Sequence, residues 1–407
     1  MNRGIPCALA LLLLAFSVKA DEAWHPIVPY LSPGKWSEGE KKFAADVPDD
    51  QTRFGLGILQ ILTAFEHLSG GLYEHGFLSD PSMPRSDRGS FFNAKPKPIN
   101  DKGAGDLIRN FVKDLAVAEA TLAGVKDPKI KLKLPIGKLF AEYRASFGRN
   151  PLMRFLPMLT EFAPAIATEA VPDENSMSVM VITFDQADVT WLRGYCHILL
   201  AFGELISACD LKDWFDRSAH FVFPKVEGPY PFLRQPRSDA FFNDPFFMVD
   251  LAAAAVTFGG PVAEPKRLEA SLEHFRMVPV LSRRMWSEVR AETDDDHEWI
   301  PGPRQKSGPA GAAVTEQMVD AWLAMLDEVA AILDGKLLVP FWRGGGTQGV
   351  NLKRAFLESK RLSALDWIQG TAAAPYLEAG PLAKPNVWNR LLDVFGDNVF
   401  GYALWFN

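Results

Sequence analysis

Cysteine is scarce in this sequence, which excludes a fold held together by disulfides. Only three cysteines occur among 407 residues, and Cys7 lies in the N-terminal apolar segment. Cys196 and Cys209 fall in one helical pattern, which would hold them about 20 Å apart, too far for a disulfide. The chain must therefore rely on its hydrophobic core. The two thiols are interpreted as small buried apolar side chains, with a reactive thiol as the alternative.

The chain also lacks an excess of basic residues and a long apolar run. Its formal net charge is −7, from 50 acidic and 43 basic residues. Without a basic stripe, this balance argues against nucleic acid as a partner and against electrostatic docking on anionic lipid. No stretch after the N-terminal segment offers the roughly 18 uncharged apolar residues of a membrane helix, so no transmembrane segment is expected in the mature chain.

The familiar catalytic and ligand-binding signatures are absent as well. There is no His-Glu-x-x-His zinc motif and no Gly-x-Ser-x-Gly nucleophile elbow. The glycine-rich stretch 344–349 (GGGTQG) lacks the ending of a phosphate loop and is interpreted as a flexible connection, with anion binding as the alternative. The acidic run 292–298 (ETDDDHE) lacks the rhythm of an EF-hand loop and is interpreted as a solvated helix end, with Ca²⁺ binding as the alternative.

The N-terminal segment has the pattern of a secretory signal peptide. Arg3 precedes an apolar core at 8–16, and Val18-Lys19-Ala20 stands before Asp21. This pattern predicts cleavage near Ala20, and the apolar core is too short to span a bilayer. We therefore expect residues 1–20 to be removed and the mature chain to be exported, either periplasmic or secreted.

The remaining sequence is organised around the long apolar stretch 185–214. It is predicted to form a helix that ends at Asp210, with a polar turn beginning at 212–217. Apolar residues recur there at helical spacing, and Asp185 or Asp188 is suited to cap its start. Arg193, His197 and Glu204 fall within roughly 40° of one another on the helix, because successive residues are about 100° apart. They form a narrow polar stripe on an otherwise apolar cylinder.

A second helix, predicted over 53–75, matches the first closely. Both fit the pattern aromatic-x-x-Gly-x-x-polar-Ile-Leu-x-Ala-Phe-x-x-Leu, with Gly57 corresponding to Gly194. The earlier helix also has a polar stripe, which contains Gln60, His67 and Glu74 at intervals of seven residues. Glycine in mid-helix suggests close approach of another helix, so we expect the two helices to cross near these glycines.

The loops after these helices favour an internal duplication. The string Pro-Arg-Ser-Asp followed by Phe-Phe-Asn occurs at 84–93 and again at 236–243. We predict a duplicated helical core over 21–299, with repeats at about 50–125 and 187–280, and a C-terminal helical extension over 300–407. The alternative is coincidence among common turn-forming residues, which the unequal lengths of the connections favour.

The expected fold class is therefore mainly α, a helical bundle with a possible short two-stranded β element. Further helices are predicted at 106–124, 138–146, 152–169, 246–257, 264–292 and 314–334, with Thr315 as a cap for the last. Pro279 is expected to kink or split its helix. Residues 129–134 and 176–184 are predicted to form two paired strands, and the apolar tail 399–407 is expected to dock on the core.

The two polar stripes are the candidate site. If they face each other across a pseudo-twofold axis, they bring together His and Glu side chains of the kind that helical bundles use to bind metals. Two alternatives stay open, a buried structural network and a partly solvated face. The candidate binding residues are Gln60, His67, Glu74, Arg193, His197 and Glu204, and the candidate metal ligands among them are His67, His197 and Glu204.

The strings RFGLGILQ, LYEHG and DVTWLRGYCHILLAFGE resemble those of a family of uncharacterised exported bacterial proteins. The resemblance implies a helical secreted protein and supplies no activity, cofactor or catalytic residue. We expect a non-catalytic protein that binds an unknown ligand or envelope protein. The alternative is a metal-dependent or His/Glu-based enzyme with its site between the duplicated helices.

Overall fold

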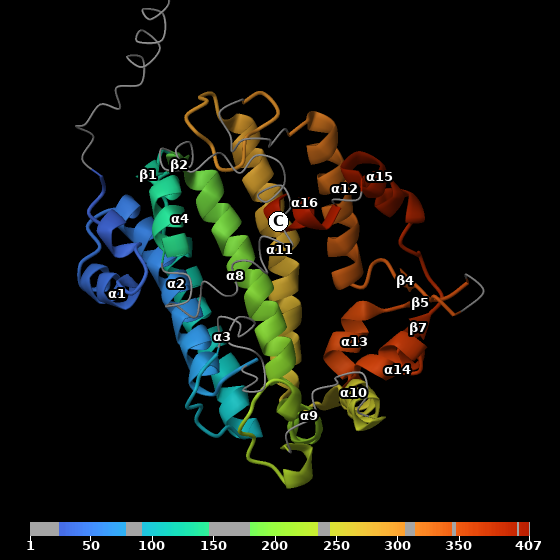
Figure 1. Ribbon diagram of the computed structural model, residues 1–407. Coiled ribbons are helices and arrows are strands. Elements are labelled where there is room, and N and C mark those ends of the chain that lie inside the picture. The colour runs from blue at the N-terminus through green and yellow to red at the C-terminus, as the bar shows by residue number, and fades with distance from the viewer. Residues whose placement is uncertain are drawn as a thin grey trace, which may run out of the picture.

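A row of long helices, each packed against the next along the chain, forms the body of the molecule (Figure 1). The computed structural model describes residues 24–78, 92–145, 180–234, 245–305, 314–343, 347–396 and 399–406. In this row, α2 (Asp50–Glu74) packs on α3 (Asp101–Ala123), α3 on α8 (Gln186–Ser207), and α8 on α11 (Pro265–Ala291). α1 (Trp36–Ala45) covers α2, and α12 (Glu316–Leu333) follows α11.

Side-chain caps explain where several of these helices begin. Asp185 is the N-cap of α8, and it forms a reciprocal capping box with Asp188, which confirms the predicted start. Thr315 caps α12 by accepting a hydrogen bond from the backbone N–H of Met318, also as predicted. The caps of α2 and α3, Asp49 and Asn100, place both helices a few residues earlier than their apolar patterns indicate.

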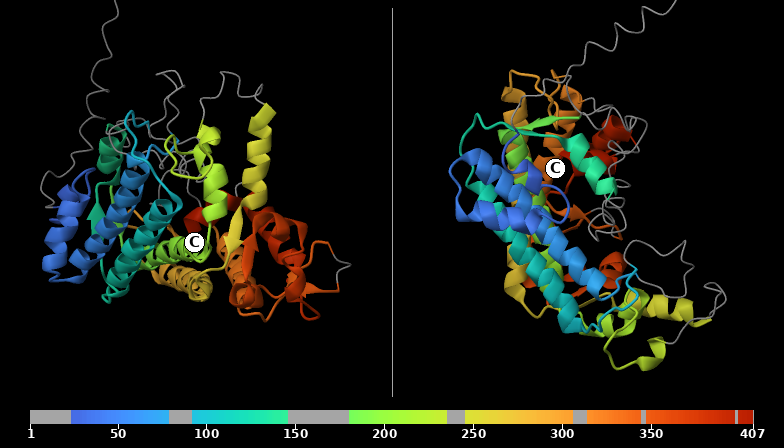
Figure 2. Two further views of the ribbon diagram at one scale, coloured as in Figure 1. Left: turned by 90° about the horizontal axis from the view of Figure 1, so that it is seen from below. Right: turned by 60° about the vertical axis from the view of Figure 1, so that its left-hand side comes forward.

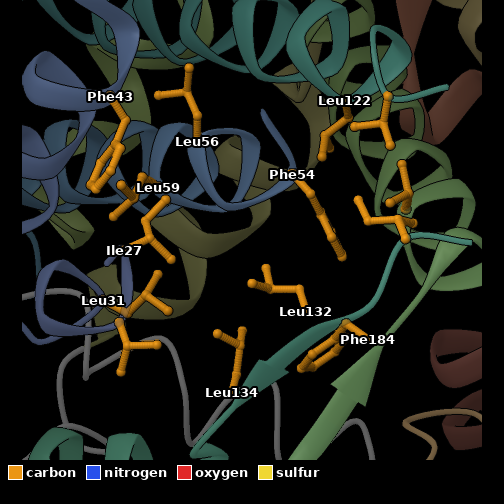
Figure 3. Close-up of a cluster of buried hydrophobic side chains, with 14 of the residues drawn as sticks. Ile27, Leu31, Phe43, Phe54, Leu56, Leu59, Leu122, Leu132, Leu134 and Phe184 are labelled. Carbon is orange, nitrogen blue, oxygen red and sulfur yellow. The ribbon is translucent and has the colours of Figure 1, made fainter. Parts of the chain in front are cut away.

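The predicted two-stranded element is present beside the bundle. β1 (Leu132–Leu134) pairs antiparallel with β2 (Ile182–Phe184), and α4 (Ile136–Ala145) follows β1. Phe54 of α2 and Phe184 of β2 meet edge to face, with ring centroids 6.4 Å apart. Together with apolar residues from α1, α2, α3 and β1 they form the first buried core (Figure 3).

A second core joins the C-terminal part of the chain to α11 and α12. α15 (Pro385–Phe395) packs on α12, and α16 (Val399–Phe406) inserts its end beside α11. Phe406 is fully buried against Trp286, with ring centroids 4.7 Å apart. The prediction that the apolar tail docks on the core is therefore confirmed.

Shorter elements gather at the end of the row where α8 stops and α11 starts (Figure 1). They are α9 (Lys212–Ser218), α10 (Pro245–Thr257), α13 (Leu352–Glu358), α14 (Ala364–Gln369) and the paired strands β3 (Gly259–Pro261) and β6 (Arg361–Ser363). A small antiparallel sheet of β4 (Val339–Pro340), β5 (Gly349–Val350) and β7 (Leu377–Glu378) lies beyond α13. α9 and α10 lie side by side and project from the body (Figure 2).

The mainly α fold with a short β element is thus confirmed, while three details differ from the sequence prediction. Pro279 does not split α11, which is one helix from Pro265 to Ala291. The helix predicted to end at Asp210 ends at Ser207, and the polar turn expected at 212–217 is the helix α9. α2 and α8 do not cross each other near Gly57 and Gly194. Instead, α2 packs mainly on α3, and α8 packs mainly on α11 and α3. Gly57 does mark a close approach, but its partner is Leu122 of α3.

Several predictions fall outside the described residues. These are the signal peptide, the helix at 152–169, and the repeated Pro-Arg-Ser-Asp and Phe-Phe-Asn strings apart from Phe92 and Asn93. The internal duplication therefore stays a prediction. No helix in the described ranges has both the length and the apolar character needed to cross a membrane.

Candidate functional site

The polar stripe of α8 lies in a seam between α3 and α11. Arg193 Nη2 is 2.8 Å from Glu119 Oε1 on α3, and His197 Nε2 is 3.5 Å from the same oxygen. Burial opposes ionisation of Glu119, but hydrogen bonds from His197 and Arg193 outweigh it and lower the pKa of Glu119 to about 2. Two residues of the predicted stripe are therefore anchored to one ionised carboxylate that the sequence did not single out.

The seam continues toward α11 through a pair of histidines and a further ion pair. The Nδ1 atoms of His197 and His274 are 2.8 Å apart, so one ring donates a hydrogen bond and the other accepts it. Burial, followed by the nearby His197, lowers the pKa of His274. About two turns further along α8, Glu204 accepts a 2.7 Å hydrogen bond from Arg267.

The polar residues of α2 do not contact the seam, and two of them have partners of their own. His67 is exposed and pairs with Asp114 at 2.8 Å, and Glu74 pairs with Lys97. Gln60 is buried, and its Oε1 has no hydrogen-bond partner among the described residues. The stripes of α2 and α8 therefore do not face each other as predicted, since α3 packs against both helices.

The structure does not bring the candidate metal ligands His67, His197 and Glu204 together, for the same reason. Among the described residues, one group of three His, Cys, Asp or Glu side chains has ligand atoms close enough for a shared ion, and it contains neither histidine. That group is Asp185, Glu292 and Glu298. The side chains of Arg193, His197 and Glu204 are instead held in ion pairs and hydrogen bonds, which agrees with the interpretation as a buried structural network.

An apolar cavity of about 420 Å³ lies at the C-terminal end of α8. Its size is within the range of small-molecule sites. Its lining comes from α8, α9, α11, α13, α14 and the β3–β6 pair, and it includes Leu205, Ile206, Trp214, Phe258, Leu362 and Trp367. Trp214 and Phe258 meet edge to face, with centroids 5.4 Å apart. Residues far apart in the sequence thus build one apolar wall.

Glycine allows the backbone around this cavity to pack closely. Gly259 has a φ of +123° and pairs with Ser363, and a Cβ there would lie 2.1 Å from the carbonyl oxygen of Leu362. A Cβ on Gly260 would lie 1.8 Å from the carbonyl oxygen of Asp210. Only glycine fits either position, because a backbone atom cannot move aside as a flexible side chain can. These two glycines let β3 lie between β6 and the end of α8.

Exposed apolar side chains accompany the cavity. Phe258, which lines it, is 50% exposed, and on the adjoining α10 the side chains of Phe246, Met248 and Val249 are more than 60% exposed. Ile368 of α14 is 75% exposed. These exposed side chains belong to α10, to α14, which packs against α10, and to the residue that precedes β3.

The sequence analysis predicted α10 as a helix but did not use its unusual composition. Asp250 is its only charged residue, so the helix has apolar residues on every side. Such a helix is expected to be buried on all sides, yet among the described elements it packs mainly on α9 and, to a lesser extent, on α14.

Comparisons with protein-family models, with curated proteins and with solved structures find no match to this chain. The resemblance to exported bacterial proteins therefore stays a prediction, and the function is argued from the chain's own geometry.

Proposed function

We propose that this protein is an exported, non-catalytic binding protein that holds the acyl chain of an anionic amphiphile, such as a long-chain fatty acid. The observation that carries the proposal is the apolar lining of the 420 Å³ cavity at the end of α8. The predicted signal peptide supports an exported location, and the polar seam around His197 supports a structural rather than catalytic role for those residues.

The lining favours an apolar ligand because its few polar groups already have partners. The hydroxyl of Ser363 accepts a hydrogen bond from the backbone N–H of Asp366, and the thiol of Cys209 donates to the carbonyl of Leu205. A polar ligand would lose its hydrogen bonds to water without replacement, which costs free energy. An alkyl chain gains about 25 cal/mol for each Å² of apolar surface removed from water.

Two basic residues beside the cavity favour an anionic head group. Lys360 and Arg361 are exposed and directly precede Leu362, which lines the cavity. Neither forms an ion pair with a described residue, and the nearby Glu358 is already paired with Arg354 at 2.8 Å. We place a carboxylate or phosphate head group beside these two cations and the acyl chain against Trp214 and Trp367, which line the cavity.

Quenching by a brominated fatty acid tests the site directly. Bromine quenches tryptophan emission only at short range, and Trp214 and Trp367 both line the cavity. We expect saturable quenching by dibromostearate in the wild-type protein and its loss in the double variant Trp214→Phe/Trp367→Phe. Quenching that persists in the double variant places the ligand elsewhere and overturns the proposal.

A matched pair of variants at Ala364 tests occupancy without disturbing a fully buried residue. Ala364 is half-buried in the first turn of α14 and lines the cavity. Ala364→Trp should fill the cavity and weaken oleate binding at least tenfold by calorimetry, whereas Ala364→Ser should bind as the wild type does. Equal binding by all three proteins contradicts the proposal.

Charge reversal at Lys360 and Arg361 distinguishes the contribution of the ligand's head group to binding from that of its acyl chain. Lys360→Glu/Arg361→Glu should weaken binding of oleate and leave binding of oleyl alcohol unchanged, because only oleate carries the charge. If both ligands lose affinity equally, the basic pair does not select the head group.

A further inference from the structure

Three carboxylates converge at the opposite end of the α8–α11 pair. Asp185 is the N-cap of α8, Glu292 is the C-cap of α11, and Glu298 belongs to the loop that follows. Each offers a carboxylate oxygen, and these oxygens all lie within 4.8 Å of one another. Asp185 and Glu292 also line a cavity of about 560 Å³. We call these three residues the carboxylate centre.

The centre has more negative than positive charge around it. Asp188 lies next to Asp185 and is buried, with its Oδ2 accepting a hydrogen bond from the Asp185 N–H. Lys131 is the nearby cation, and it is paired with Asp294. On the same face, Lys133 lies opposite Thr183 in the β1–β2 pair. Burial, together with the neighbouring carboxylates, raises the pKa of Glu292 to about 8 and that of Glu298 to about 7.

Thr183 supplies an independent sign of a ligand. Its side chain is 1% exposed, and its hydroxyl oxygen has no hydrogen-bond partner among the described residues. Phe184 points into the first core (Figure 3), so strand alternation places Thr183 on the opposite side of the chain, together with Asp185. The Thr183 N–H donates to the carbonyl of His297, which directly precedes Glu298.

Gln186 adds a second oxygen of the same kind. Its Oε1 atom is buried without a hydrogen-bond partner, and the residue lines the 560 Å³ cavity with Asp185 and Glu292. A buried oxygen without a donor loses free energy, and a bound cation or an ordered water removes that cost. Thr183 and Gln186 stand on either side of Asp185 in the sequence, so the unpartnered atoms nearest it along the chain are both oxygens, the donor type that the carboxylates also supply.

We propose that the carboxylate centre binds one Ca²⁺ ion, with Asp185, Glu292 and Glu298 as its charged ligands. Hard divalent cations prefer oxygen, and Ca²⁺–oxygen distances of about 2.4 Å place opposite ligands up to about 4.8 Å apart. The three carboxylate oxygens lie within that span of one another. Three protein carboxylates favour Ca²⁺ over Mg²⁺, because Mg²⁺ usually keeps several waters and binds through one or two carboxylates.

The centre also joins two elements that the ion would hold together. Glu292 follows the last turn of α11, whose terminal carbonyls favour a cation, and Asp185 begins α8. Binding requires ionised carboxylates, so uptake of Ca²⁺ should release protons from Glu292 and Glu298.

Calorimetry with Ca²⁺ on the full chain tests the proposal. We expect one Ca²⁺ per chain at pH 8, with affinity at least tenfold lower in Glu292→Gln and Glu298→Gln. Asp295→Asn is the matched control, because Asp295 is exposed in the same acidic run and is not a member of the centre. Its affinity should equal that of the wild type.

Thermal melts separate a cation site from a purely structural hydrogen-bond network. In chelator, Glu292→Gln should melt at or above the wild-type temperature, because it removes repulsion among carboxylates. With Ca²⁺, only the wild type and Asp295→Asn should gain stability. Absence of Ca²⁺ uptake at pH 8 overturns the proposal. So does uptake that Glu292→Gln and Glu298→Gln leave unchanged, since the ion would then lie elsewhere.

Discussion

Glu119 is the central residue of the polar seam between α3, α8 and α11, although the sequence analysis did not single it out. Its carboxylate holds both Arg193 and His197, and its side chain is only 17% exposed. Removing one member of a buried ion pair leaves the other charge without compensation. The stability of this seam should therefore depend on a residue of α3 rather than on the α8 stripe alone.

We predict that Glu119→Gln lowers the free energy of unfolding by about 3 kcal/mol at pH 7, as expected for breaking a largely buried pair. Urea unfolding followed by circular dichroism measures the change. Asp114→Asn is the matched control on the same helix, because its pair with His67 is exposed and should contribute less than about 1 kcal/mol. Equal losses in the two variants would show that the seam is not buried as described.

The sequence identified the α8 stripe but not its partners, for a physical reason. Helical spacing places Arg193, His197 and Glu204 on one face of α8, and the structure keeps them there. Which helix meets that face depends on the packing of apolar surfaces along the whole chain. Glu119 and Arg267 lie on ordinary amphipathic helices, and nothing in their spacing separates them from solvated residues.

At the scale of elements, α2 contains two glycines with opposite roles. A Cβ on Gly57 would lie 2.4 Å from Cδ2 of Leu122, which is fully buried and has no room to move. A Cβ on Gly70 would meet no atom within 4 Å. The first glycine permits close packing of α2 on α3, and the second only weakens the helix.

Alanine substitution should therefore change stability in opposite directions. Gly57→Ala should destabilise the protein by about 1–3 kcal/mol through overpacking. Gly70→Ala should stabilise it by about 1 kcal/mol, because alanine has the higher helix propensity. Chemical denaturation of both variants measures the difference, and a stabilising Gly57→Ala would contradict the close approach to Leu122.

Local signals predicted the elements better than their surroundings. Capping residues and apolar periodicity identified α8 and α12, and β-rich composition identified the β1–β2 pair. Pro279 was expected to interrupt α11, but the surrounding packing keeps the helix continuous, since Leu272, Leu281 and Met285 on either side are buried. Tertiary packing therefore stabilises a continuous helix that local propensity alone does not predict.

At the scale of the whole molecule, the two proposed sites lie at opposite ends of α8 and α11. The apolar cavity uses the C-terminal end of α8, and the carboxylate centre uses its N-terminal end. The cavity was not foreseen, and the Ca²⁺ alternative for the run 292–298 did not include Asp185, because each site joins residues that are far apart in the sequence. The acidic run 292–298 was interpreted as a solvated helix end, which holds for the exposed Asp294 and Asp295 but is wrong for Glu298, buried at 2% exposure.

These groups give the whole protein a distinct dependence of stability on pH. The folded-state pKa of Glu119 is lowered from 4.5 to about 2, so its contribution is complete above pH 4.5 and is lost as the pH falls toward 2. The pKa values of Glu292 and Glu298 are raised to about 8 and about 7. Their contribution is complete below the unfolded value of 4.5 and is lost as the pH rises through 7 and 8.

We therefore predict that, in chelator, the melting temperature is highest near pH 4.5, where both contributions are present, and falls toward pH 2 on the acid side and toward pH 8 on the alkaline side. Glu119→Gln should reduce the acid loss, and Glu292→Gln should reduce the alkaline loss, because each removes the group responsible. Ca²⁺ should abolish most of the alkaline loss in the wild type, since the ion replaces the protons that the carboxylates release. Calorimetric melts from pH 3 to 9, with and without Ca²⁺, measure all three effects. If Glu292→Gln leaves the alkaline fall in melting temperature unchanged, the carboxylate centre does not cause it. If Glu292→Gln and Ca²⁺ each remove that fall, the same carboxylate oxygens bind the protons and the ion.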